Sequence, residues 1–375
     1  MRDVVKRKLA AIQELYPPER IEKSKERWRR LWQGEAPLDR LPFVASPVTI
    51  PYYDSVDTAE ERLMRSLDEF LYRGIFQDDF IPALFPGCRQ ATIPNLFGAQ
   101  EIVMGNDHGC ERLVNTAEEV AALPEPTIRP GSIAQEWLDM QAYFVEETAG
   151  QLPVHVVDMQ GPVDVAAQLW GYDNLLAAAY LEPDAYDRLL SLTSEAFLLF
   201  WKAQEKTIGP ENFVGTHLFG WDWVPPGTGA TLSADSMVMV SADYYREFYE
   251  PYHLRIGEAL GGLTIHSCGD FSKMIPALNN TRCLRGVNAG QMTVAQLVEG
   301  GLDKRLVLIA NSSMEKAPAL FEQIGRENLR ADVSVQPWPA NERAFRPWAW
   351  TKEDRLEIKR NEELLLRLAF QFGKK

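Results

Sequence analysis

A histidine and a cysteine two positions apart close one of the apolar runs of the chain. The segment Leu263-Thr-Ile-His266-Ser-Cys268-Gly269-Asp270 has the character of a strand that ends in a tight turn. Alternate residues of an extended strand face the same side, so His266 and Cys268 can point toward one atom. Imidazole nitrogen and thiolate sulfur together suit zinc. The spacing therefore predicts a metal site, while a buried cysteine beside a hydrogen-bonded histidine is the structural alternative.

A zinc site needs more than two protein ligands, and the sequence leaves the next one open. Asp235 can supply a carboxylate, either as a third ligand or as a group that orients the substrate. Other candidates for this position are His217, Asp222 and Glu315. Cys283 follows a predicted helix and precedes the next strand, which places it at the wrong end of its unit for convergence with Cys268. Cys88 and Cys110 lie in loop-like stretches far upstream.

A segment rich in glycine, proline and tryptophan follows the apolar run that ends at His217. It reads Gly220-Trp221-Asp222-Trp223-Val-Pro-Pro-Gly and is typical of a long loop over a substrate site. Trp221 and Trp223 are candidates to stack on a flat substrate, or else they cover the top of the fold. We also assign His217 and Asp222 to substrate binding.

Arg89 is a candidate for substrate binding, and two residues already named are candidates for catalysis. Arg89 follows an apolar run and can bind a carboxylate with two parallel hydrogen bonds, although a surface arginine is the simpler interpretation. Asp235 and His266 are the candidate catalytic residues, because a carboxylate and an imidazole can hold or move a proton near neutral pH.

Short apolar runs alternate with longer helical segments through most of the chain. The runs lie at 80–84, 154–158, 213–218, 263–266, 284–288, 305–310 and 331–335, and the helical segments at 133–147, 175–207, 241–260, 293–299, 314–326 and 351–370. Strand followed by helix, repeated this often, predicts an α/β protein with a parallel sheet. Seven or eight units favour a single (β/α)8 TIM barrel, with a doubly wound sheet as the alternative.

The first third of the chain is predicted to be helical, over residues 6–15, 18–31 and 58–71, with a short apolar run at 41–46. We therefore divide the chain into an N-terminal helical extension, 1–75, packed on a barrel, 76–375. Active sites of such barrels lie at the carboxyl ends of the strands. The polar residues at these ends are His155, Asp158, His217, His266, Cys268, Asn288, Asn311 and Gln336.

The composition excludes several classes of protein. The 375 residues are 46% hydrophobic and 25% charged, with a formal net charge of −14, so a basic surface for nucleic acid is not expected. No run approaches the roughly 20 apolar residues that cross a bilayer. Four cysteines make no disulfide framework. We expect a cytoplasmic protein that acts on a small molecule, without a membrane or nucleic-acid partner; a homo-oligomer is left open.

Four segments resemble the uroporphyrinogen decarboxylase-like superfamily, from about Phe80 to the last strand. They are Asn95-Leu-Phe-Gly-Ala-Gln-Glu101, Gln160-Gly-Pro-Val-Asp-Val-Ala-Ala-Gln-Leu-Trp-Gly171, the stretch from Asp235-Ser-Met to Glu-Pro-Tyr252, and Ile265-His-Ser-Cys-Gly269. The resemblance implies a TIM barrel. The Arg-Gln-Ala-Gly-Arg-Tyr motif of authentic uroporphyrinogen decarboxylases is not found near residues 41–54.

The His-x-Cys-Gly segment is similar to the branch that contains cobalamin:coenzyme M methyltransferases. That resemblance implies zinc bound by His266 and Cys268 and a corrinoid as methyl carrier, with a corrinoid protein as partner. The branch takes its third ligand from a cysteine near the last strand, where this chain reads Val333-Ser-Val-Gln-Pro-Trp-Pro. We expect zinc-assisted methyl transfer. The alternatives are a metal-independent decarboxylase with His266 as proton donor, and a barrel that binds a ligand without turnover.

Overall fold

A parallel sheet of six strands forms the centre of the molecule. The computed structural model describes residues 2–37, 39–48, 58–104, 107–216 and 223–373. The strands follow the order β1-β10-β9-β8-β7-β6, and every pairing is parallel. Their bounds are β1 Val44–Ala45, β6 Ala230–Ser233, β7 Leu263–Ser267, β8 Leu284–Ala289, β9 Val307–Ser313 and β10 Arg330–Gln336. The mixed α/β class predicted from the sequence is confirmed.

The rest of the strand pairing is fragmentary. β4 (Val154–His155) pairs with β5 (Phe213–Val214) in parallel, and β2 (Glu101–Met104) pairs with β3 (Asp107–Cys110) in an antiparallel hairpin. Single parallel bridges join Leu84 to Val154, Cys88 to Asp158, and Gln160 to Ser233. Within the described ranges, the strands therefore do not form one uninterrupted ring, and the closed eight-stranded barrel that we expected is not seen as a single sheet.

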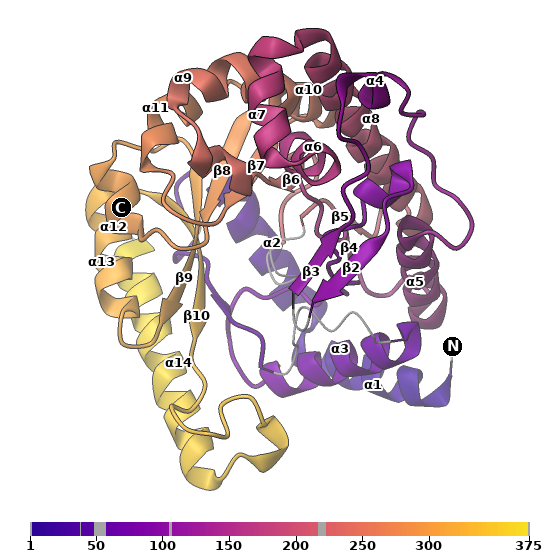
Figure 1. The fold of residues 1–375 in the computed structure, drawn as a ribbon. Coiled ribbons are helices and arrows are strands. Elements are labelled where there is room, and N and C mark those ends of the chain that lie inside the picture. Colours follow the sequence, from indigo (N-terminus) through magenta and orange to yellow (C-terminus); the bar gives the residue numbers. More distant parts are fainter. Residues whose placement is uncertain (1, 38, 49–57, 105–106, 217–222, 374–375) are drawn as a thin grey trace.

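Helices surround these strands and follow the predicted pattern (Figure 1). Their bounds are α1 Asp3–Leu15, α2 Pro18–Gln33, α3 Ala59–Arg73, α4 Ala117–Ala121, α5 Ile133–Thr148, α6 Pro162–Trp170, α7 Tyr172–Leu181, α8 Pro183–Ile208, α9 Ala242–Tyr244, α10 Glu250–Leu260, α11 Ile275–Leu278, α12 Val294–Glu299, α13 Ala317–Glu327 and α14 Lys352–Gly373. Across the described part of the chain, no helix is both long and apolar enough to cross a membrane.

Local sequence signals explain where these helices begin and end. The side chain of Thr58 accepts a hydrogen bond from the backbone N–H of Glu61, and the Glu61 carboxylate accepts one from the backbone N–H of Thr58, so a capping box starts α3. Proline stands at the first position of α2 and of α8, where its missing N–H costs nothing. Pro183 thereby divides the long helix expected at 175–207 into α7 and α8. The segment expected at 241–260 includes a π-helical turn, Tyr245–Tyr249, before α10.

β6 differs from the sequence-based expectation, whereas β1 lies in the short apolar run at 41–46, for which a strand was one interpretation. β6 lies in a stretch that we assigned to a long loop, because Ala230-Thr-Leu-Ser is short and follows a glycine- and proline-rich segment. β1 lies within the predicted N-terminal extension, yet Val44 pairs with Ser334 and Ala45 with Val335 of β10. The extension therefore contributes a strand to the central sheet as well as helices α1 to α3.

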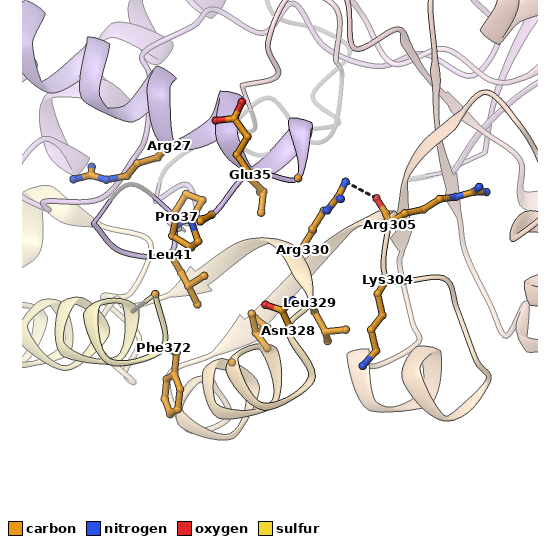
Figure 2. A pocket seen from close by; sticks show the side chains of 17 residues that line it. Arg27, Glu35, Pro37, Leu41, Lys304, Arg305, Asn328, Leu329, Arg330 and Phe372 are labelled. Atoms are coloured by element: carbon orange, nitrogen blue, oxygen red, sulfur yellow. Dashed lines mark hydrogen bonds between the residues drawn. The ribbon is translucent and has the colours of Figure 1, made fainter. Parts of the chain in front are cut away.

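Two cavities lie at the amino edge of the sheet, where its strands begin. The larger, of about 520 Å³, is bounded by the end of α2, by the residues before β1, β9 and β10, and by the ends of α13 and α14 (Figure 2). The smaller, of about 390 Å³, extends to the start of β8 and to Pro225–Thr228. Both are lined by Arg305 and Arg330. They are far along the strands from the carboxyl ends, where the predicted site residues lie.

Candidate functional site

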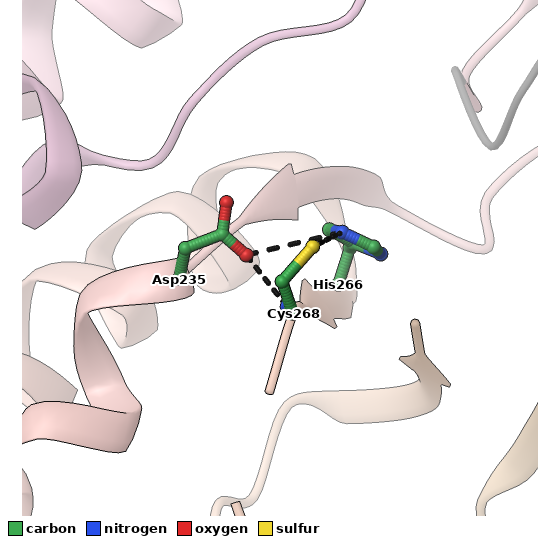
Figure 3. A group of neighbouring side chains, drawn as sticks. All are labelled: Asp235, His266 and Cys268. Atoms are coloured by element: carbon green, nitrogen blue, oxygen red, sulfur yellow. Dashed lines mark hydrogen bonds and ion pairs between the residues drawn. The ribbon is translucent and has the colours of Figure 1, made fainter. Parts of the chain in front are cut away.

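Asp235, His266 and Cys268 converge at the carboxyl edge of the sheet (Figure 3). The Cys268 sulfur lies 3.4 Å from Nε2 of His266, and Oδ1 of Asp235 lies 3.9 Å from the same nitrogen. One donor atom from each residue falls within 4.8 Å of the others. The structure thus brings together the two predicted metal ligands and the predicted catalytic carboxylate.

The pairing of β7 with its neighbour orients the histidine. His266 lies opposite Asn288 of β8, and its Nδ1 is 2.5 Å from the Asn288 side-chain oxygen. Because an amide oxygen can only accept, the contact is a hydrogen bond when Nδ1 carries the proton. Asn288 is itself held by donation from its Nδ2 to the Ile309 carbonyl, at 3.3 Å. This tautomer turns the Nε2 lone pair toward Cys268 and Asp235.

The position of Asp235 depends on β6, the other neighbour of β7. Asp235 follows β6 and begins a short 3₁₀ helix, Asp235–Met239, whose first N–H groups need acceptors. The buried carboxylate of Asp164 in α6 accepts from the backbone N–H of Asp235 at 2.7 Å and of Ser236 at 2.9 Å. Asp235 Oδ1 then accepts from the Cys268 N–H at 2.6 Å. This contact links the ends of β6 and β7.

Two glycines let the chain pass closely around the site. Gly269 has a φ of +81°, which places Cys268 on a turn that a residue with a side chain would strain, and its N–H donates to the Gln291 side-chain oxygen. A β-carbon on Gly290 would lie 3.3 Å from Cε1 of His266 and 3.5 Å from the Cys268 sulfur. The backbone of the loop after β8 therefore passes close to both the histidine and the cysteine, and Cys268 stays exposed.

The site is electrostatically negative. Partial burial, with the nearby carboxylates of Asp235, Asp158 and Asp164, raises the pKa of the Cys268 thiol to about 11. Burial raises the pKa of Asp164 to about 6, with a further contribution from Asp235. At neutral pH, Cys268 alone is thus a protonated thiol and a poor nucleophile. A cation at this position would reverse that, because it stabilises the thiolate and is attracted by the carboxylates.

The donor set fits a zinc ion. Zinc bond lengths of about 2.3 Å to sulfur and 2.1 Å to nitrogen or oxygen put tetrahedral S and N ligands about 3.5 Å apart, and N and O ligands about 3.4 Å apart. The observed separations are 3.4 Å from Cys268 sulfur to His266 Nε2 and 3.9 Å from that nitrogen to Asp235 Oδ1. The third separation, from the Cys268 sulfur to an Asp235 oxygen, is within 4.8 Å. Asn288 supplies the outer hydrogen bond that zinc-binding histidines have.

Of the remaining predicted substrate-binding residues, the described ranges include Trp223 and Arg89, and neither belongs to the Asp235–His266–Cys268 group. His217, Trp221 and Asp222 lie outside the described residues. Trp223 is half-buried and packs against a cluster of apolar side chains from the N-terminal helices and the strands. Arg89 is held by the chain's own carboxylates: its Nε lies 3.1 Å from both oxygens of Glu101, and its Nη1 donates to Glu136 at 2.6 Å. A substrate-binding role for these residues stays a prediction.

The other cysteines and strand-end residues occupy varied positions. Cys283 precedes β8 at the amino edge, as expected. Cys110 lies on β3, where its thiol contacts Gln168. The backbone of Cys88 forms an isolated parallel β-bridge with that of Asp158. Burial beside the Asp158 carboxylate raises the pKa of the Cys88 thiol. His155 is buried, and its Nδ1 lies 2.8 Å from the Thr216 carbonyl oxygen.

Sequence analysis did not identify Asp164 and Gln291 as part of the site. Asp164 lies in the segment from Gln160 to Gly171, in the first turn of α6. A carboxylate in that position commonly accepts backbone N–H groups, which was the available signal. Gln291 carries no such signal, because its contact with the Gly269 N–H depends on how two loops meet.

A solved structure of a methyltransferase from Methanosarcina mazei has a similar fold. The superposition covers 93% of this chain and 98% of that one, with a TM-score of 0.59 and 14% sequence identity. At this identity, the likeness concerns the fold. No protein-family model matches the sequence, and a search of curated proteins finds no significant match. The α/β architecture is thus shared with a methyltransferase.

Proposed function

We propose that this protein is a zinc-dependent methyltransferase, with the metal held by His266, Cys268 and Asp235. The observation that carries the proposal is the convergence of an imidazole nitrogen, a sulfur and a carboxylate oxygen within 4.8 Å at the carboxyl edge of the sheet. Asp235 takes the position of the third ligand that the sequence near the last strand does not supply. A catalytic zinc site keeps a further position open for an acceptor.

Each residue of the site has a distinct task in this proposal. Asn288 holds the proton on Nδ1 of His266, so that Nε2 presents its lone pair. The Cys268 N–H and the Asp164 cap fix Asp235. When bound, zinc lowers the pKa of an acceptor thiol so that it reacts as thiolate. Such a thiolate would form the new S–CH3 bond, and the donor would leave with the electron pair of the broken donor–carbon bond.

The proposal extends to the methyl carrier and to the architecture. A corrinoid is the donor that we propose, delivered by a partner protein or free. We also propose that the six-stranded sheet, the β4–β5 pair and the bridges at Leu84 and Gln160 together make a (β/α)8-type barrel. Two observations support this: β1 lies beside β10, and Gln160 after β4 pairs with Ser233 of β6.

The charge of the site favours methyl transfer over decarboxylation. Asp158, Asp164 and Asp235 all lie close enough to raise the pKa of Cys268. Carboxylates in this number attract a metal cation and repel the anionic carboxylate of a decarboxylase substrate.

Zinc content of the purified protein tests the proposal. We expect near-stoichiometric zinc in the wild type, none in a His266→Ala/Cys268→Ala double variant, and wild-type zinc in Cys110→Ser, which removes a thiol away from the site. The zinc-loaded protein should then demethylate methylcobalamin with 2-mercaptoethanol as acceptor, followed by the change in the corrinoid absorption spectrum.

The outcomes separate the alternatives. If the wild type remains metal-free after incubation with zinc at neutral pH, the proposed mechanism fails and the metal-independent decarboxylase becomes the leading hypothesis. Zinc without demethylation would retain the metal site and reject the corrinoid as donor. A zinc content that is the same in the double variant would place the metal elsewhere in the protein.

A further inference from the structure

Arginines stand at the amino ends of three neighbouring strands. Arg330 is the first residue of β10, Arg305 lies two residues before β9, and Arg285 is the second residue of β8. The three strands are adjacent in the order β10-β9-β8, and Val307 of β9 is opposite both Arg330 and Gly286. Because adjacent strands are about 4.8 Å apart, the starts of these three strands span about 10 Å. All three arginines line the smaller of the two cavities at this edge.

Two of these arginines have no acidic partner among the described residues. Arg305 lies 3.4 Å from the Asp303 carboxylate. With the described residues, Arg330 makes one hydrogen bond, from Nη1 to the Arg305 carbonyl at 2.9 Å (Figure 2). For Arg285, the described part of the structure shows neither a hydrogen bond nor an ion pair. In a chain of net charge −14, two unbalanced guanidinium groups beside one cavity are a local excess of positive charge.

Glycines give both side chains the room they occupy. A β-carbon on Gly34, which ends α2 with a φ of +73°, would overlap the guanidinium of Arg330. A β-carbon on Gly262 would lie 2.9 Å from Cγ and 3.2 Å from Nε of Arg285. Backbone thus packs against each arginine, which limits its movement and reduces the entropy lost when a ligand binds.

We propose that this cavity binds a small molecule carrying two or more phosphate groups. Guanidinium groups donate paired hydrogen bonds to phosphate oxygens. The two cavities share Arg305 and Arg330, and their volumes of about 520 and 390 Å³ are in the range of sites for small organic ligands. The site lies at the opposite end of the strands from His266 and Cys268 and is independent of the metal chemistry proposed there.

Isothermal titration calorimetry with inorganic pyrophosphate tests this site. We expect saturable binding to the wild type. The affinity of Arg285→Gln and of Arg330→Gln for pyrophosphate should be lower by about tenfold or more, since each replacement removes charge-assisted hydrogen bonds. Arg326→Gln, an exposed arginine of α13 outside both cavities, is the matched control and should bind as the wild type does. The His266→Ala/Cys268→Ala variant should also bind normally, which excludes pyrophosphate bound through a metal.

Absence of saturable binding to the folded wild type would overturn the proposal, as would equal affinity in the wild type, Arg285→Gln and Arg330→Gln. Because Arg285 is exposed, its replacement leaves the core intact, and circular dichroism of each variant verifies folding. ADP in place of pyrophosphate separates the two sources of the same chemistry. Tighter binding of ADP identifies a nucleotide, and tighter binding of pyrophosphate identifies an inorganic or non-nucleotide ligand.

Discussion

The two edges of the central sheet carry opposite chemistry. At the carboxyl edge, β7 and the residue after it present imidazole and thiol, surrounded by carboxylates of Asp158, Asp164 and Asp235. At the amino edge, β8, β10 and the turn before β9 present arginines beside two cavities. The same strands therefore offer a cation site at one end and an anion site at the other. In a parallel sheet all equivalent ends lie together, so residues far apart in sequence meet at each edge.

Replacement of Asp235 tests the negative edge most directly. In Asp235→Asn, the amide oxygen still accepts from the Cys268 N–H, but the charge is lost. If three protein ligands share roughly 12 kcal/mol of zinc binding, the loss is about 4 kcal/mol, or roughly 1,000-fold in affinity. Competition with a chromogenic chelator measures it. Asp243→Asn, an exposed aspartate paired with Arg246, is the control. A change below about tenfold would remove Asp235 from the ligand set.

Acid limits the pH range over which the two edges can be compared. Burial lowers the pKa of His253 to about 4, whereas an unfolded histidine titrates near 6.5. A lowered histidine pKa favours the neutral form in the folded state, so this contribution is fully present above pH 6.5 and is lost as the pH falls toward 4. The loss amounts to about 3 kcal/mol.

Urea unfolding at pH 7 and pH 4 measures this effect. His253→Gln, which cannot take up a proton, should lose about 3 kcal/mol less unfolding free energy between the two pH values than the wild type. Identical losses in both proteins would show that His253 does not titrate in this way. The expected difference rests on the complete burial of His253, which lowers the pKa of its imidazole.

A smaller effect is expected when the support of the histidine is removed. Asn288→Ala deletes the acceptor for Nδ1–H of His266, and loss of such an outer hydrogen bond lowers metal affinity by about 10- to 100-fold. Asn288→Asp restores an acceptor and should recover most of the affinity. Asn311→Ala, an exposed residue of the neighbouring strand, should bind zinc as the wild type does. Equal zinc affinities in Asn288→Ala and Asn311→Ala would show that Asn288 does not support the metal site.

The smallest expected effect concerns Gly34, which packs against Arg330 at the amino edge. Gly34→Ala forces a side chain into a left-handed conformation and displaces Arg330, whereas Gly131→Ala, at a φ of +75° with open space around it, has only the conformational cost. Both should lower the unfolding free energy by about 1 kcal/mol. Pyrophosphate binding should weaken in Gly34→Ala alone, and zinc affinity should change in neither. Weaker zinc binding in Gly34→Ala would show that the two edges are coupled.

Part of the fold and of the site follows from local sequence patterns. Helices α1 to α3 and strands β7 to β10 were predicted because their helix formers and apolar runs are long enough to be distinctive. His266 and Cys268 were predicted because strand geometry alone places them on one side. The contact of Asp235 with Cys268 depends on the ends of β6 and β7 being neighbours, and β6 was not predicted at all. Support from Asp164, 71 residues before Asp235, likewise requires the tertiary structure.

The sequence did not predict the cluster of arginines at the amino edge, for a related reason. Arginine is common on protein surfaces, and nothing in the order of Arg285, Arg305 and Arg330 marks them as neighbours. Only the pairing of β8, β9 and β10 makes their spacing visible. Closure of the eight-stranded barrel was expected from the number of strand-helix units, yet the described pairing is interrupted around β4 and β5.

The pairing of β1 with β10 affects the order of events during synthesis. Val44 emerges from the ribosome 290 residues before its partner Ser334. At about 5–20 residues per second, β1 waits on the order of 15–60 s for that strand. During this time, apolar surface around β1 and its unpaired backbone groups are open to other chains. The nascent protein therefore depends on α1 to α3, or on a chaperone, to shield its first strand until the last one arrives.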